Sequence, residues 1–102
     1  MVVKITEFRV KRDTDVKKLC NAIVSAIKNK ETLQIVVVGM PALYTAMKGV
    51  ALARGMLLGS GIELAVSPYF KAVNLPSGEE RTALVLMCIA APIFIEVEQN
   101  AV

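Results

Sequence analysis

Two long uncharged segments set the first limits on how this chain can fold. The first covers residues 33–47 and the second covers residues 82–95, and a proline interrupts each of them. A helix that crosses a bilayer needs about 20 consecutive apolar residues, so neither segment spans a membrane. Short apolar runs bounded by turn residues instead favour strands with apolar side chains on both faces. We predict two such strands, at 33–39 and 81–91.

The N-terminal third predicts a strand followed by a helix. Residues 2–9 are β-branched and aromatic, which is typical of a strand. The Asp-Thr-Asp segment at 13–15 offers N-cap side chains, and Lys28 places a cation at the other end, where it suits the helix dipole. From Val16 onward, apolar residues recur with the i, i+3, i+4, i+7 spacing of one helix face. They are Leu19, Cys20, Ile23, Val24 and Ile27.

A second helix follows a glycine-proline turn. Gly39 and Pro41 place proline near the first helical position, and Gly55 is expected to end the helix. Small residues recur along one face, so this face is expected to lie tightly against the sheet or the other helix. These small residues are Ala42, Ala46, Gly49 and Ala53. The outward face is formed by Tyr44, Lys48 and Leu52.

Turn residues organise the last third of the chain. A third strand over 62–73 is expected to be broken or bent at Pro68, and the turn at 76–78 leads into the fourth strand as a β-hairpin. The element order is β-α-β-α-β-β, and right-handed crossovers place both helices on one face of a four-stranded mixed sheet. We predict a two-layer α/β fold, with a single domain at 1–91 and a C-terminal extension at 92–102.

Two helices cover only one face of this sheet, although two of its strands are apolar on both faces. A second subunit or the extension is therefore expected to cover the other face. The extension contains the apolar residues Ile93, Phe94, Ile95 and Val97. We predict a homodimer or a higher homo-oligomer, with the extension docked on the domain or on a partner subunit.

Side chains suited to catalysis are scarce. The chain has no histidine, which removes the commonest general base and the commonest metal ligand. Cys20 and Cys88 lie far apart within apolar runs, so buried free thiols are expected. We predict no enzymatic activity, no catalytic residue, no metal site and no cofactor. Charged residues interrupt the N-terminus before an apolar stretch of signal-peptide length forms, so a cytoplasmic location without a membrane partner is expected.

Positive charge is concentrated in the first third of the chain. Residues 1–30 hold eight Lys or Arg and three Asp or Glu, a net +5, whereas residues 31–102 carry a net −2, which leaves the +3 of the whole chain. A cluster at the first strand-helix junction contains Lys11, Arg12, Lys17 and Lys18. Cations near a helix N-terminus oppose the helix dipole, and a phosphate partner would relieve that cost. The alternative is a solvated face in which Asp13 and Asp15 are the partners.

The second predicted helix carries one charge in its middle. Lys48 follows Tyr44 by one turn, so a cation and an aromatic ring share a face. Such a pair can hold a phosphate and stack a base, or form part of a protein interface. A lysine that only extends into solvent is the alternative. Arg54 is expected in the last turn, where a cation suits the dipole.

Three sequence blocks resemble the stage V sporulation protein S family. They are Ala46-Met47-Lys48-Gly49-Val50-Ala51-Leu52-Ala53-Arg54-Gly55, Ser60-Gly61-Ile62-Glu63-Leu64 and Gly78-Glu79-Glu80-Arg81-Thr82-Ala83. The resemblance covers residues 2 to 90. It implies an Alba-like α/β fold, a cytoplasmic bacterial regulator of sporulation and septation, and nucleic-acid binding as a dimer or higher oligomer. Lys48 and Arg54 match a lysine and an arginine of the family's second helix.

The chain departs from this family at two places. The segment 11–21 is more charged than the serine-rich segment of the family, so Lys11 and Arg12 are supported only by analogy with the fold. Residues 92–102 extend past the family's usual end.

The leading hypothesis is a non-enzymatic, oligomeric regulator that binds DNA or RNA. Its predicted binding residues are Lys11, Arg12, Lys17, Lys18, Tyr44, Lys48 and Arg54. The alternative is a module that binds a protein partner through the small-residue face of the second helix and the apolar extension.

Overall fold

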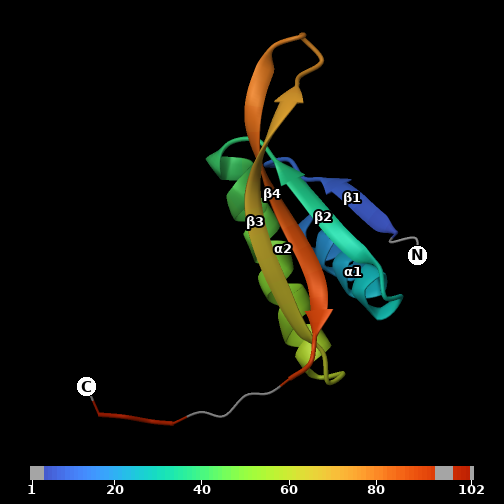
Figure 1. The fold of residues 1–102 in the computed structure, drawn as a ribbon, viewed down its shortest axis with the longest axis vertical. Coiled ribbons are helices and arrows are strands. Elements are labelled where there is room, and N and C mark those ends of the chain that lie inside the picture. Colours follow the sequence, from blue (N-terminus) through green and yellow to red (C-terminus); the bar gives the residue numbers. More distant parts are fainter. Residues whose placement is uncertain (1–3, 94–97, 102) are drawn as a thin grey trace.

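The computed structural model describes residues 4–93 and 98–101 and shows an α/β fold (Figure 1). Its elements follow the predicted order, β-α-β-α-β-β. They are β1 (Ile5–Arg9), α1 (Val16–Lys28), β2 (Thr32–Val37), α2 (Met40–Leu58), β3 (Glu63–Asn74) and β4 (Glu80–Ala91). One mixed sheet has the strand order β1-β2-β4-β3, in which β1 and β2 are parallel and the other neighbours are antiparallel. Within the described residues, no helix is both long and apolar enough to cross a membrane.

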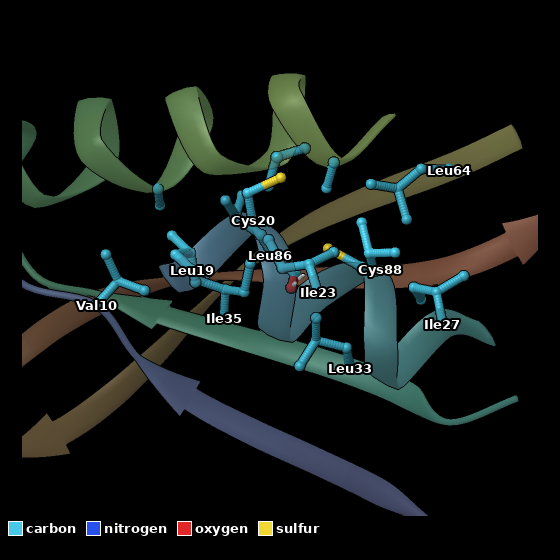
Figure 2. Close-up of a cluster of buried hydrophobic side chains, with 14 of the residues drawn as sticks. Val10, Leu19, Cys20, Ile23, Ile27, Leu33, Ile35, Leu64, Leu86 and Cys88 are labelled. Atoms are coloured by element: carbon cyan, nitrogen blue, oxygen red, sulfur yellow. Dashed lines mark hydrogen bonds between the residues drawn. The ribbon is translucent and has the colours of Figure 1, made fainter. Parts of the chain in front are cut away.

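Both helices pack on the same face of the sheet, as predicted. One hydrophobic cluster joins Ile23 of α1 and Val50 of α2 with Leu33 and Ile35 of β2. Leu33 and Ile35 alternate along β2, so their side chains lie on one face, and Ile35 pairs with Leu86 on β4. Figure 2 shows Ile23, Leu33, Ile35 and Leu86 between the helices and the strands. The main core is therefore the layer between the sheet and the two helices.

The opposite face of the sheet carries no helix. A smaller cluster on it consists of Val36, Ala83 and Val85, with Val38 and Val73 packed against it. Around this cluster, three apolar side chains on that face are exposed. They are Ile5, Tyr69 and Ile89. That a second subunit or the extension covers this face of the sheet stays a prediction. In the extension, Phe94, Ile95 and Val97 lie outside the described residues, and residues 98–101 are exposed.

Helix α2 is longer than the sequence pattern predicts. It continues through Gly55 to Leu58, so the expectation that Gly55 ends it is wrong. A glycine inside a helix costs about 1 kcal/mol relative to alanine, and the fully buried side chain of Leu57 in the following turn offsets this cost. The chain leaves the helix at Gly59, and Gly61 adopts a positive φ of 78°.

Strand β3 runs without a break through Pro68, which pairs with Leu86 of β4. Proline is tolerated there because β3 is an edge strand and Pro68 needs no donor toward the neighbouring strand. The β3–β4 pairing continues for four residue pairs beyond the last β2–β4 pair, Val37 with Leu84. The hairpin therefore projects past the other strands and the helices (Figure 1).

The small residues of α2 face the interior, as expected. Ala46, Gly49 and Ala53 are buried, and a Cβ built on Gly49 would lie 2.6 Å from Leu19 Cδ2 of α1. The two helices cross closely at this point, and a side chain at Gly49 would require Leu19 to shift. This small-residue face is therefore occupied within the chain and is not free for a partner.

Candidate nucleic-acid interface

The loop between β1 and α1 carries Lys11 and Arg12, both exposed, on a fixed backbone. Val10 is buried, and its N–H donates to the carbonyl oxygen of Val36 at 3.1 Å. The Lys11 N–H donates to Thr14 Oγ1 at 2.8 Å, and the Thr14 N–H donates to the Lys11 carbonyl oxygen at 3.1 Å. These reciprocal bonds close a tight turn, so the two cations project from a defined position.

Thr45 ties this loop to α2. Its side chain is buried, and its Oγ1 donates to the carbonyl oxygen of Arg12 at 2.8 Å, with the Pro41 carbonyl oxygen 3.1 Å away. The bond holds the loop against the second turn of α2, the turn that contains Tyr44. Reasoning from the sequence missed Thr45, although a hydroxyl at an interior helix position must find an acceptor when it is buried.

The first turn of α1 carries Lys17 and Lys18, both exposed. Asp15, the last residue of the segment 13–15 that was expected to supply the cap, is the N-cap: its Oδ1 accepts the Lys18 backbone N–H at 3.1 Å. No acidic residue occupies the first turn, so the two lysines oppose the helix dipole.

The predicted partners Asp13 and Asp15 form no ion pair with this basic cluster. Among the described residues, the carboxylate-cation pairs within 4.0 Å join Lys4 to Glu31, Arg9 to Glu7 and Arg54 to Glu63. Within that part of the chain, the alternative of a cluster neutralised by its two aspartates is therefore not supported.

Tyr44 and Lys48 share the outward face of α2, as predicted. The Lys48 Nζ lies 4.6 Å from the centroid of the Tyr44 ring, which is a cation-π distance. The Tyr44 side chain is 68% exposed, so one ring face remains open to a stacked group. Thr45, the residue next to Tyr44 in the sequence, joins the β1–α1 loop to this turn of α2.

Arg54 lies at the other end of α2. At about 1.5 Å per helical residue, it is about 14 Å along the axis from Thr45. The helix continues past it, so the prediction that it occupies the last turn is wrong. Its Nε and Nη2 donate to Glu63 Oε1 and Oε2 at 2.6 and 2.8 Å. The hydrogen bonds to Arg54 lower the pKa of Glu63, and the same bonds raise the pKa of Arg54. A role for Arg54 in nucleic-acid binding stays a prediction.

The structure adds one cation that the sequence reasoning missed. Arg9 lies on β1, and with Lys11 and Arg12 it lines a cavity of about 540 Å³. Alternation along β1 places Arg9 on the face of the sheet away from the helices. The residues that lie across the cavity from Arg9 are set by the strand order, which the local sequence pattern does not give.

Elsewhere among the described residues, no three His, Cys, Asp or Glu side chains gather as a metal site would require. Cys20 and Cys88 are buried free thiols, as predicted.

The comparison with known families covers nearly all of this architecture. Residues 6–91, from β1 to the end of β4, match the family model described as Stage V sporulation protein S.

Proposed function

Because the chain belongs to the stage V sporulation protein S family, a family of sporulation regulatory proteins, we propose that it serves its sporulation-related role by binding nucleic acid. In this proposal it acts without catalysis, in the cytoplasm, as a homo-oligomer. The binding surface combines the basic cluster of the β1–α1 loop and the first turn of α1 with the Tyr44–Lys48 pair.

One observation carries the proposal. Five cations form no ion pair with a carboxylate of the described residues; four of them lie in the β1–α1 loop and the first turn of α1, and the fifth lies in the middle of α2. They are Lys11, Arg12, Lys17, Lys18 and Lys48. Unpaired cations at a helix N-terminus cost stability, which phosphates would recover. Lysines contact phosphates rather than base edges, so binding is expected to depend on salt and to show weak sequence specificity.

A mobility-shift titration tests the proposal. Single- and double-stranded DNA and RNA are titrated at low salt with wild type, Lys11→Ala/Arg12→Ala and Lys48→Ala. Removing a cation that binds a phosphate is expected to lower the slope of log K against log salt by about 1. Lys28→Ala, in the last turn of α1, removes one charge outside the proposed surface and is the control. No shift with wild type at about tens of micromolar protein contradicts nucleic-acid binding.

Apolar side chains exposed on α2 support the oligomer. They are Met40, Met47, Leu52 and Met56. Sedimentation velocity at micromolar concentration is expected to show a dimer or larger species, and a monomer contradicts it. Leu52→Glu on α2 and Ile89→Glu on the open sheet face distinguish which surface is used.

The same face of α2 favours a second candidate function, a module that binds another protein. Here the exposed side chains replace the small-residue face that the sequence suggested. Pull-down from the native cytoplasm with and without nuclease separates the two functions. A partner that persists after nuclease and is absent with Leu52→Glu favours the protein-binding module.

A further inference from the structure

A cavity of about 540 Å³ lies where the β1–α1 loop, the end of β2 and the β3–β4 hairpin meet. Its volume is within the range of about 300 to 1,000 Å³ that is typical of small-molecule sites. One wall is basic and contains Arg9, Lys11 and Arg12. The lining residues include no aspartate or glutamate.

The basic wall points to an anionic ligand. Arg9 has one weak partner, Glu7, at 4.0 Å, and its side chain is 73% exposed. Lys11 and Arg12 have no carboxylate within 4.0 Å among the described residues. Three like charges on one wall repel each other, and two of them are guanidinium groups whose paired donors match phosphate oxygens.

The composition of the remaining wall indicates that the ligand also carries a flat, mostly apolar group with a polar edge. Val36, which is buried, and Val73 come from the face of the sheet without helices, and both belong to the small cluster there. Asn74 also lines the cavity, and its amide offers both donors and an acceptor. An apolar surface with a few polar groups that fix orientation is the usual composition of a ligand site.

The cavity walls are held in place by hydrogen bonds within the chain. The Val10 N–H bonds to the Val36 carbonyl oxygen on one side. On the other side, Leu75 in the hairpin turn donates its N–H to the carbonyl oxygen of Glu79 and accepts the N–H of Gly78, both at 2.8 Å. A preformed site avoids the ordering cost that a mobile loop adds to binding.

We propose that this cavity binds one nucleotide unit, with its phosphate against Arg9, Lys11 and Arg12 and its base against Val36 and Val73 beside Asn74. A phosphate joined to a flat heterocycle with a hydrogen-bonding edge matches both walls. Two sources have this chemistry. If the nucleotide is part of a nucleic-acid strand, the proposal rests on the proposed function and extends the nucleic-acid interface into the cavity. If it is a free nucleotide, its binding is independent of that function.

A cavity-filling variant tests the proposal without a change of charge. Val73→Trp fills the cavity from β3, and Ser67→Trp adds the same side chain to an exposed position of the same strand. Amide signals are followed by NMR during titration with adenosine, guanosine, cytidine and uridine 5′-monophosphates, ribose 5-phosphate and inorganic phosphate. The same variants are titrated with an oligonucleotide in the mobility-shift assay. Circular dichroism checks folding, and Leu75→Trp, in the hairpin turn, replaces Val73→Trp if that variant unfolds.

We expect saturable shifts at the amides of the lining residues with at least one nucleoside monophosphate, and weaker binding of ribose 5-phosphate and phosphate. Val73→Trp is expected to weaken that affinity at least about tenfold, which is about 1.4 kcal/mol, whereas Ser67→Trp leaves it unchanged. If Val73→Trp retains oligonucleotide binding, the ligand is a free nucleotide. If Val73→Trp abolishes it, the nucleotide belongs to a strand.

Three results overturn the proposal. One is equal affinity for phosphate and for every nucleotide, and another is nucleotide binding that Val73→Trp leaves intact. The third is a combination of two results: nucleotides up to about 10 mM cause no saturable shift of the amide signals, and Val73→Trp leaves oligonucleotide binding unaffected. Nucleotide binding by a wild type that binds no oligonucleotide contradicts only the function proposed above.

Discussion

Thr45 Oγ1 donates a 2.8 Å hydrogen bond to the carbonyl oxygen of Arg12, a residue 33 positions earlier in the sequence. This bond fixes the basic loop relative to the outward face of α2. The relative position of the two halves of the proposed interface therefore depends on one buried hydroxyl.

Thr45→Val removes that donor and keeps the shape of the side chain. A partly buried carbonyl oxygen is left without its partner, so we expect a decrease of about 1–2 kcal/mol in the free energy of unfolding. Nucleic-acid affinity is expected to fall as well, because the loop is no longer held. Urea denaturation and mobility shift measure the two effects. Thr82→Val, at an exposed position of β4, is the control, and equal behaviour of the two variants contradicts the role given to Thr45.

Two glycines of α2 are expected to respond in opposite directions to alanine. A Cβ at Gly49 meets Leu19 Cδ2 at 2.6 Å and Cγ at 2.9 Å, whereas a Cβ at Gly55 has no neighbour within 4 Å. Crowding costs about 1–3 kcal/mol and exceeds the gain in helix propensity, so Gly49→Ala destabilises the fold. Gly55→Ala raises the free energy of unfolding by about 0.5–1 kcal/mol. Thermal and urea unfolding measure both, and the same sign for both variants refutes the close helix crossing.

Lys17→Glu is expected to separate stability from binding. A carboxylate in the first turn of α1 suits the helix dipole, so stability rises by about 0.3–1 kcal/mol at low ionic strength. Nucleic-acid affinity falls, because a cation of the proposed interface becomes an anion. Lys28→Glu makes the same charge change in the last turn of α1, and it is expected to lower stability and to affect binding less. If Lys17→Glu binds nucleic acid with unchanged affinity, α1 is not part of the interface.

The Arg54–Glu63 pair predicts a pH-dependent contribution to stability. Hydrogen bonds from Arg54 lower the pKa of Glu63 in the folded protein below its unfolded value. The stabilisation is therefore complete above the ordinary carboxyl pKa of about 4.3. It disappears as the pH falls through the lower folded pKa. We expect Glu63→Gln to be less stable than wild type at neutral pH and to converge with it in acid. Glu79→Gln, in the hairpin turn, is the control, and a difference that persists in acid argues against the ion pair.

Burial predicts that the cysteines are unreactive in the folded protein. Burial raises the pKa of the Cys88 thiol to about 11, and Cys20 is also buried. Because the thiolate is the reactive form, Cys88 is expected to resist a disulfide reagent at about pH 8 and to react in denaturant. Cys20→Ala isolates Cys88 for this measurement. Rapid reaction of native Cys20→Ala contradicts the packing around Cys88.

Local patterns predicted the features that depend on neighbouring residues. The apolar spacing from Val16 onward indicated α1, the segment 13–15 was expected to supply its N-cap, and Gly49 was placed on a face that packs closely. The errors concern positions where distant contacts decide. Gly55 remains helical because Leu57 is buried beyond it, and the strand is not broken at Pro68 because β3 is at the edge.

The candidate site was predicted only in part for the same reason. The basic loop and the Tyr44–Lys48 pair follow from adjacent residues or from helical spacing. The partner of Arg54 comes from the next strand, and the cavity beside Arg9 is lined by residues of β1, β2 and β3 that the strand order brings together. Strand order is a global property of the fold, and no local pattern in this sequence specifies it.

Pro68 has a consequence for how copies of this chain can associate. Its nitrogen carries no proton, and since β3 pairs with β4 on its inner side, the missing donor lies on the outer edge of the sheet. A strand from another molecule that added to this edge would lack a hydrogen bond at the middle of its ladder. Growth of a continuous intermolecular sheet from β3 is thereby discouraged, and contact between copies is directed to side-chain surfaces instead of exposed backbone.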